Sequence, residues 1–537
     1  MTGQNAITLV LNAGVPFIRE TGPLFTFQEA PFFETLDETF IPLLGLFDRL
    51  EAAHIPFRVA IVVPPVLCHL LTDPNLIERY IRYMDNRIAF GVEEIERLGG
   101  NPRLRALAGE YYDTEVDKRF LFTERYQKNI LKVLFYHKQR GRIEFINSAA
   151  TNVFFPFYTA SPSVFRAQFE IALRSGRRFF NSVEAGFWLP ELGYCAELGN
   201  ALHTHHYAWT IIDTHAALLA TPPPERGSFY PARDPSGVTL FIRDFSAYEE
   251  IMNTRGNCPQ SGAFRSYFDD AGYELPAEKV KRFLSSNGAR TATGYKYYAR
   301  GEGLGTKEVY EREAGVQAAR EMAAAFLKAR TDSLAAARAA FGKMPVSVCA
   351  YHADYFGRFW HEGCVFLEAL FREAARRDDV RFVTPSEYLS RQDAGEFQTL
   401  HPVFTSEGHN GYAEDYLDAS NDWVYRHILR ASERMSELAG RFHEESDDLR
   451  ERALNQAARE LLLAQDVEWV RIISTGEQRL SGEWPQYARE RIETHLRNFT
   501  TFYEALGSDY ISTRFLTDLE QRDNIFPDMN YRVFTSR

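Results

Sequence analysis

The chain has 537 residues, of which 45% are hydrophobic and 25% charged, a balance typical of a globular protein and not of a disordered one. Its length predicts several structural units, because single cores seldom grow beyond about 300 residues. The formal net charge of -12 argues against nucleic acid and anionic membranes as partners, since both attract clustered cationic side chains. The sequence also lacks an apolar run of the roughly 18 residues that a membrane-spanning helix needs.

The N-terminal sequence and the cysteines favour a cytoplasmic protein with reduced thiols. Residues 1–20 lack a basic leader and a small-residue cleavage site, so they predict a first buried strand rather than a signal peptide. The cysteines are widely spread and show no CxxC spacing, which gives no indication of a zinc site. They are Cys68, Cys195, Cys258, Cys349 and Cys364.

Short apolar runs separated by amphipathic helical stretches predict buried strands. In chain order the runs cover residues 6–12, 57–63, 143–149, 207–213, 237–244, 346–351 and 380–385. Strands that alternate with helices imply right-handed crossovers between parallel neighbours. The predicted fold class is therefore α/β, with a barrel-like core of about seven strands.

Three segments depart from this alternation. Residues 90–140 are helical and polar and delay the third strand, so we expect a helical subdomain inserted in the barrel. The Pro-rich stretch at 221–236 has neither helical nor strand periodicity, which favours a loop that closes over a site. Residues 401–537 show helical periodicity alone, so the prediction is a barrel over residues 1–400 followed by a C-terminal helical domain.

Polar side chains follow the predicted strands, where the functional groups of parallel barrels gather. Taken singly, each has an ordinary structural explanation, such as a hydrogen-bonded core histidine. Together, carboxylates and histidines at successive strand ends indicate a glycosidase-type site, in which one carboxylate attacks the anomeric carbon and a second group protonates the leaving oxygen. The candidates are Asn12, Asn152, Glu191, Asp213, His215, Arg243, Asp244, His352 and Asp354.

Aromatic side chains accompany these polar residues. They make up 14% of the chain, which fits either large cores or a groove in which sugar rings stack on aromatic faces. The candidates for contact with a sugar are Trp188 and Tyr194 beside Glu191, and Phe359 and Trp360 after Asp354.

Several ungapped segments resemble glycoside hydrolase family 57, most closely its 1,4-α-glucan branching enzymes. They are GFWLPELGY (186–194), IIDTHAALL (211–219), YHADYFGRFWHEG (351–363), NDWVYRHILRASERM (421–435) and ELLLAQDVEWVRIISTG (460–476). The resemblance covers nearly the whole chain. It implies a distorted TIM-like (β/α)7 barrel with an inserted helical subdomain and a C-terminal all-helical domain. It also implies a retaining transglycosylation on α-glucan polysaccharide or maltooligosaccharide, with no metal or organic cofactor.

The resemblance places the nucleophile at Glu191 and puts the acid/base position at His352, with Asp354 where the family usually has a second acidic residue. The family has an aspartate at the acid/base position, so His352 is a departure from its pattern. Other departures replace family histidines and aromatic residues at the site while the scaffold motifs remain. They are Asn12, Gly14 and Asn152 in place of histidines, Glu407 in place of a tryptophan, and Phe229, next to Tyr230, in place of a lid tyrosine.

Two functions from different classes follow. In the first, the protein is an α-glucan-active branching enzyme, transferase or hydrolase whose acid/base role falls to His352 or Asp354. In the second, it is a catalytically inactive relative that binds glycogen-like or maltooligosaccharide chains and has a role in glycogen metabolism. A structural protein without affinity for glucan is a third hypothesis. The intact motif around Glu191 favours the first.

Overall fold

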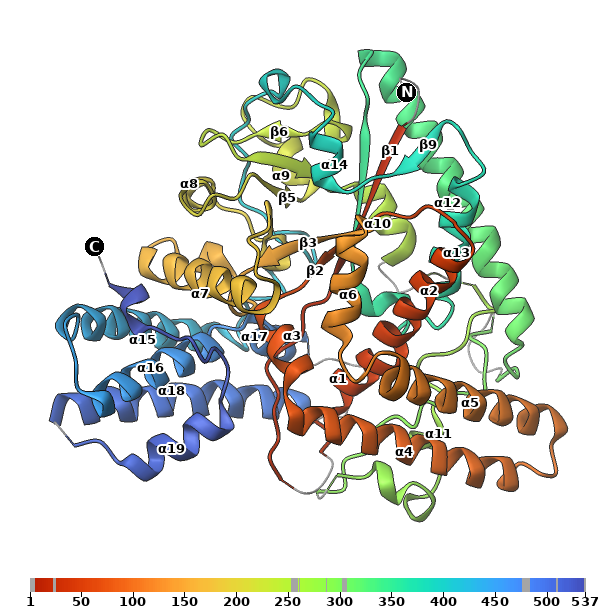
Figure 1. The fold of residues 1–537 in the computed structure, drawn as a ribbon, viewed down its shortest axis with the longest axis horizontal. Coiled ribbons are helices and arrows are strands. Elements are labelled where there is room, and N and C mark those ends of the chain that lie inside the picture. Colours follow the sequence, from red (N-terminus) through yellow and green to blue (C-terminus); the bar gives the residue numbers. More distant parts are fainter. Residues whose placement is uncertain are drawn as a thin grey trace.

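The computed structural model describes residues 5–22, 26–252, 259, 261–285, 287–301, 307–475, 483–508 and 510–535. The strands lie in the upper part of Figure 1, helices α4 (Pro74–Arg97) and α5 (Pro102–Phe120) extend at the lower right, and the C-terminal helices form a group at the lower left. Across these described ranges, no helix combines the length and the apolar character needed to cross a membrane.

The core of the fold is a ring of parallel strands. Its order is β7-β5-β4-β3-β2-β1-β8, and each neighbouring pair is parallel. A parallel bridge between Arg243, which follows β7, and Val348 of β8 joins the two ends of this order. The strands are β1 (Asn5–Asn12), β2 (Val59–Val62), β3 (Ile143–Ser148), β4 (Gly186–Trp188), β5 (Trp209–Ile212), β7 (Thr239–Ile242) and β8 (Val346–His352).

The predicted α/β barrel is thus confirmed, with three differences in its strands. The run at 380–385 forms β9 (Val380–Phe382), which pairs with the first residues of β1 and lies outside the ring. Strand β4 was not predicted, because three residues are too few to show a periodicity. Strand β6 (Ala232–Arg233) pairs antiparallel with β7, so the segment at 221–236 contains a short strand that the prediction of a simple loop missed.

Side chains on alternate strand positions fill the inside of the ring, as the period of two along a strand requires. Trp209 is fully buried among them, and its indole N–H donates to Ser386 Oγ at 3.2 Å. The inward residues include Val10, Val62, Ile146, Trp188, Trp209, Ile211, Phe241 and Val348. The ring is a packed core and not a pore.

The helices α4 and α5 lie between β2 and β3, in the region where the sequence predicts an inserted subdomain. They pack against side chains of the long connection from β7 to β8, which are Ala271, Val280, Phe283, Tyr295, Tyr297, Ala299 and Tyr310. Phe90 of α4 contacts the rings of Phe283 and Tyr295, with centroids 5.4 and 5.3 Å apart. A separate aromatic core therefore holds these two connections together.

The C-terminal part is helical, as predicted, and α16 packs against α18 in Figure 1. Its helices are α15 (Asp422–Arg441), α16 (Asp448–Ala464), α17 (Val467–Thr475), α18 (Trp484–Ser508) and α19 (Thr513–Arg522). Cys68, Cys195, Cys349 and Cys364 are buried free thiols. Cys258 lies outside the described residues.

Strand β4 depends on a glycine, which gives a test of the fold. A Cβ atom on Gly186 would lie 2.1 Å from the ring of Trp209, so Gly186→Ala forces the buried indole to move. We expect a loss of about 1–3 kcal/mol in the free energy of unfolding, as for other overpacked cores. Urea denaturation followed by circular dichroism measures it.

Gly109→Ala is the matched control for Gly186→Ala. Gly109 lies inside helix α5 and a Cβ there meets no atom within 4 Å, so alanine should raise stability by up to about 1 kcal/mol. Equal effects of the two substitutions would contradict the close packing of β4 on Trp209.

Candidate active site

Glu191 follows strand β4 in the short turn η4 (Pro190–Leu192), at the end of the barrel where the parallel strands finish. Its backbone has φ 54° and ψ 25°, and Leu192 follows with φ 47°. For residues other than glycine, this left-handed conformation costs about 1–2 kcal/mol each and persists only where the surrounding structure holds it. The Glu191 side chain is 6% exposed, so the turn fixes a buried carboxylate.

Two side-chain donors hold this carboxylate. Asn152, after β3, donates from Nδ2 to Oε1 at 2.7 Å, and the hydroxyl of Tyr416 donates to Oε2 at 2.8 Å. The backbone N–H of Glu407 donates to the carbonyl of Glu191 at 2.5 Å. Hydrogen bonds to a carboxylate favour its ionised form and fix its orientation. These contacts therefore give the carboxylate of Glu191 a defined direction.

A buried chain of ion pairs runs beside Glu191. Arg243 donates from Nη1 to Glu407 at 2.9 Å, and its Nη2 pairs with Asp213. The guanidinium carbon lies 3.9 Å from the ring centroid of Tyr248. Burial disfavours the charged guanidinium, but the two carboxylates raise the pKa of Arg243 above its ordinary value. Burial also disfavours ionised Asp213, yet Arg243 lowers the pKa of that carboxyl to about 2.

His352 ends strand β8 and faces Glu407 and Asn12. Its Nε2 lies 3.8 Å from Glu407 Oε2, and Asn12 Nδ2 lies 3.5 Å from Nδ1. Asn12 and His352 are partners in the register of β1 with β8. With 30% of its side chain exposed, the imidazole is open to solvent while the carboxylates around it are buried.

The charges of this cluster change the proton affinities of Glu191 and His352. Burial raises the pKa of Glu191, with His352 opposing and the carboxylates of nearby residues adding to the increase. Burial disfavours the imidazolium form of His352, but Glu407 and Glu191 outweigh it and raise the pKa of His352. The two groups therefore hold protons at higher pH than their isolated side chains would.

Asp354 lies in the turn η8 (Ala353–Phe356), two residues after His352. Its carboxylate forms an ion pair with Arg358 at 3.8 Å. Arg358 donates from Nε to Glu34 at 3.0 Å, and its backbone N–H donates to Thr39 Oγ1 at 3.1 Å. These contacts attach the loop that carries Asp354 to residues 34–39.

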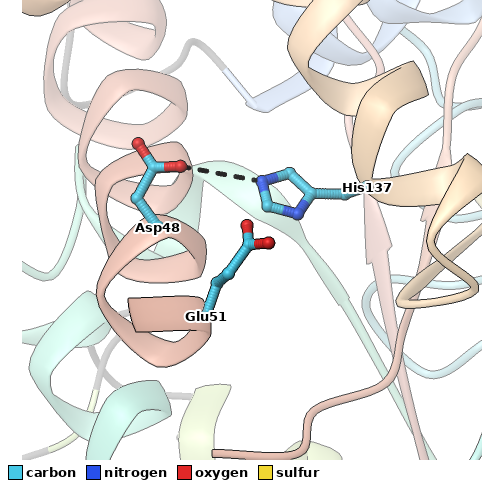
Figure 2. A group of neighbouring side chains, drawn as sticks. All are labelled: Asp48, Glu51 and His137. Carbon is cyan, nitrogen blue, oxygen red and sulfur yellow. Dashed lines mark ion pairs between the residues drawn. The ribbon is translucent and has the colours of Figure 1, made fainter. Parts of the chain in front are cut away.

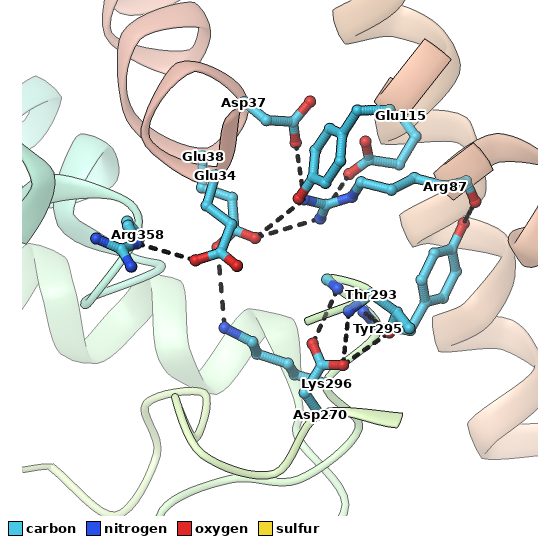
Figure 3. Close-up of polar contacts among 12 residues, drawn as sticks. Glu34, Asp37, Glu38, Arg87, Glu115, Asp270, Thr293, Tyr295, Lys296 and Arg358 are labelled. Carbon is cyan, nitrogen blue, oxygen red and sulfur yellow. Dashed lines mark hydrogen bonds and ion pairs between the residues drawn. The ribbon is translucent and has the colours of Figure 1, made fainter. Parts of the chain in front are cut away.

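Residues 34–39 also belong to a buried cluster of charged side chains, drawn in Figure 3. Arg87 of α4 lies at its centre, with oxygens of Asp37, Glu38 and Glu115 between 3.2 and 3.3 Å from the guanidinium nitrogens. Gly357 packs on the same segment, because a Cβ there would lie 1.9 Å from the carbonyl oxygen of Glu38. The inserted helices thus support the loop that follows β8.

The structure does not bring all predicted residues to this cluster. Asp244 accepts hydrogen bonds from Arg330 at 3.1 Å and from Ser347 at 2.6 Å. These partners differ from those of the neighbouring Arg243, which pairs with Asp213 and Glu407. His215 lies nearer, with Nδ1 3.8 Å from Asp213 and Nε2 2.9 Å from the carbonyl of Gly411. Its bond to Asp213 raises the pKa of His215.

Most of the predicted sugar-stacking residues are buried. Trp188, Tyr194 and Trp360 are 1–2% exposed, and Trp360 packs among Phe264, Phe356 and Phe366, so none of the three presents a ring face to a sugar in this structure. Phe359 is half-buried and contacts the ring of Tyr355 at 5.5 Å.

At the predicted lid, Phe229 is half-buried. The hydroxyl of the adjacent Tyr230 donates to carbonyls of Ala337 and Lys343, at 3.1 and 3.2 Å. Tyr230 is therefore directed toward the end of helix α12 (Arg312–Phe341) and not toward Glu191.

Sequence reasoning missed the contribution of the C-terminal residues. Tyr416 binds Glu191 directly, and the backbone N–H of Val467 donates to the carbonyl of Asn152 at 2.8 Å. Buried Asp466, next in the chain to Val467, has its pKa raised by burial and then by Glu468 and Glu191. Tyr416 lies in an irregular segment without periodicity, so no pattern in the sequence marks it.

Among the described residues, the side-chain groups that are close enough to share a metal ion contain none of the residues of this cluster. The chemistry available here is that of a fixed carboxylate beside a protonatable imidazole. A buried carboxylate and a protonatable imidazole at the strand ends of a parallel barrel are the kinds of group that glycosidases of the carboxylate type use.

The chain belongs to glycosyl hydrolase family 57, which matches residues 8–401. Residues 427–534 match the C-terminal domain of 1,4-alpha-glucan branching enzymes. These matches confirm the family that the motifs around Glu191 and His352 indicated.

Individual relatives extend over the whole chain. The 1,4-alpha-glucan branching enzyme TK1436 of Thermococcus kodakarensis is 24% identical, over 97% of this chain and 77% of that protein. The crystal structure of the alpha-amylase AmyC from Thermotoga maritima covers 100% of both chains with a TM-score of 0.91 and 30% identity. The branching enzyme of Pyrococcus horikoshii has the same fold, with a TM-score of 0.86 at 22% identity over 100% of this chain and 97% of that one.

The raised pKa of His352 predicts how stability depends on pH. A group whose pKa is higher in the folded state stabilises the fold fully below its unfolded pKa, near 6.5, and loses that contribution as pH rises through the folded pKa. The difference in melting temperature between wild type and His352→Gln should therefore shrink as the pH rises above about 6.5. Exposed His203→Gln is the control, and a difference that grows with pH would contradict the assignment.

Proposed function

We propose that this protein is an α-glucan-active enzyme of the branching type, which works by a retaining mechanism with Glu191 as nucleophile and His352 as acid/base. The observation that supports this proposal is the arrangement of Glu191. A carboxylate fixed by Asn152 and Tyr416, next to an imidazole of raised pKa, has the two groups that a retaining glycosidase needs.

In the proposed reaction, Glu191 attacks the anomeric carbon of an α-1,4-linked glucose. The imidazolium of His352 gives its proton to the leaving glycosidic oxygen, and a glycosyl ester on Glu191 forms. The neutral imidazole then takes a proton from the incoming hydroxyl, which attacks the same carbon and releases Glu191. A sugar 6-hydroxyl as acceptor gives an α-1,6 branch, whereas water gives hydrolysis.

His352 is a better candidate for the acid/base than Asp354 in this arrangement. Its ring faces Glu407, whose backbone N–H binds the carbonyl of Glu191. Asp354 lies in the following turn, where Arg358 is its ion-pair partner at 3.8 Å. A group that must carry a proton into the reaction needs a raised pKa, and the pKa of His352 is raised because Glu407 and Glu191 outweigh the effect of burial.

The alternative is a catalytically inactive protein that binds glucan chains. The replacement of family histidines by Asn12, Gly14 and Asn152 supports it, because these changes remove imidazole groups from the site. The burial of Trp188, Tyr194 and Trp360 speaks against stacking through those rings. A binding function would depend on exposed aromatic residues near His215, such as Tyr412, whose ring lies 5.3 Å from the imidazole.

The first test of the proposal is the product formed from amylose. We expect the wild type to introduce α-1,6 branches, which debranching and chain-length analysis detect. Glu191→Gln, which keeps the shape of the side chain, should abolish them while the melting temperature stays close to that of the wild type. Shorter linear chains instead of branches would indicate hydrolysis. No product from the wild type, together with saturable binding of maltooligosaccharide, would support the inactive binder.

Variants at position 352 test the acid/base role. His352→Ala should lower kcat by about 10²–10⁴, the usual contribution of a general acid. His352→Asp restores the carboxyl that the family has here, so it should keep activity, with the alkaline limb of the pH profile moved to lower pH because a carboxyl loses its proton earlier. Unchanged activity of His352→Ala, with loss in Asp354→Ala, would transfer the role to Asp354.

A further inference from the structure

A second group of ionisable side chains lies where helix α2 (Ile41–Ala52) contacts helix α6 (Ile130–Gln139). Asp48 and Glu51 are three residues apart on α2, so they share one face of that helix. His137 projects from α6 toward them, and Figure 2 shows both carboxylates directed at its ring. One ligand atom from each residue lies within 4.8 Å of the other two.

The imidazole of His137 is the unusual feature of this group. Its side chain is 0% exposed, and neither ring nitrogen has a hydrogen-bond partner among the described residues. Asp48 Oδ1 lies 4.0 Å from Nε2, which is beyond hydrogen-bond length. Buried polar groups nearly always have a partner, because an unsatisfied one costs free energy. The ring therefore needs a partner that the protein side chains do not supply.

Neighbouring hydroxyl and guanidinium groups fix the carboxylates, through one oxygen of Asp48 and both oxygens of Glu51. Asp48 Oδ2 accepts hydrogen bonds from Tyr126 at 3.1 Å and pairs with Arg125 at 3.0 Å, which leaves Oδ1 directed at His137. Glu51 accepts from Tyr136 at 3.1 Å and pairs with Arg142 at 2.8 Å. Carboxylates that bind a metal commonly have such partners, which set their orientation.

We propose that Asp48, Glu51 and His137 bind a divalent transition-metal cation such as Zn²⁺, with water completing its coordination. An imidazole nitrogen with two carboxylate oxygens is a ligand set that zinc accepts, at metal-ligand distances of about 2.0–2.2 Å. A cation at those distances gives the ring of His137 its missing partner. Ligand atoms up to 4.8 Å apart require only small side-chain rotations to reach one ion.

The surroundings set the strength and the role of the site. Aromatic rings of Phe47 and Phe57 cover the imidazole, with centroids 5.6 and 6.1 Å from it, and limit access of water. Arg125 and Arg142 repel a cation, so we expect affinity in the micromolar range. Because α2 and α6 flank the barrel far apart in the sequence, a shared ion would join them and stabilise the fold.

The test uses the full-length protein after treatment with EDTA and equilibrium dialysis against zinc chloride. We expect the wild type to bind one more zinc ion than Glu51→Gln. The Glu51 side chain is partly exposed, so the substitution should leave the fold intact, which circular dichroism checks. Zinc should raise the melting temperature of the wild type and not that of Glu51→Gln. The association constant of the site should fall at least about tenfold in the variant.

His69→Gln is the matched control. His69 also packs against aromatic rings, those of Phe179 and Phe526, and its Nε2 lacks a hydrogen-bond partner within the described part of the chain. Among the described residues, His69 belongs to no group that could hold a metal ion, so this variant should bind as much zinc as the wild type. The amount of zinc bound by exposed histidines is the same in the wild type and both variants, so it does not affect the differences between them. Equal stoichiometry in wild type and Glu51→Gln, or equal loss in His69→Gln, would overturn the proposal.

Discussion

The buried guanidinium of Arg243 connects the closure of the barrel to the geometry of the site. Its backbone forms the bridge to Val348 that joins the two ends of the strand order. Its side chain pairs with Asp213 at one strand end and with Glu407 from the segment beyond the barrel. Removing one partner of such a buried network leaves uncompensated charge, which commonly costs about 3–5 kcal/mol. The ion pairs of Arg243 therefore stabilise both the closure of the barrel and the arrangement of the side chains at the site.

Glu407 extends that support to Glu191, the proposed nucleophile. Its side chain lies between Arg243 and His352, and its backbone N–H binds the carbonyl of Glu191. Tyr416 follows in the same segment and fixes the carboxylate itself. The barrel alone supplies Glu191 with one side-chain donor, Asn152, so the segment after the barrel completes the site. The backbone of Glu191 can hold its left-handed conformation because contacts from both parts of the chain restrain it.

The sequence predicted those features that depend on local pattern. Runs of Val, Ile and Leu indicated most of the ring strands, and the motif around Glu191 indicated the family. Strand β4 was not predicted, because Gly186–Trp188 is too short to show a periodicity. The contact of Tyr416 with Glu191 was not predicted either, because the two residues are 225 positions apart and Tyr416 lies in an irregular segment. The aromatic residues of the motifs were predicted as sugar contacts, but whether a tryptophan such as Trp360 is exposed depends on tertiary packing, which local sequence does not determine.

This chain has His352 at the position where its resemblance to the family places an aspartate. A histidine there changes the balance of charge at the proposed reaction centre. A carboxyl acid/base adds a negative group next to Glu191 once it has given up its proton, whereas histidine is positive before transfer and neutral after it. The positive ring lowers the pKa of Glu191 and opposes the effect of burial. A nucleophile paired with a cation is more fully ionised but less reactive, so the exchange favours ionisation at the expense of attack. Glu407 limits this cost, because it shares the charge of His352 and leaves Glu191 bound mainly by the neutral donors Asn152 and Tyr416.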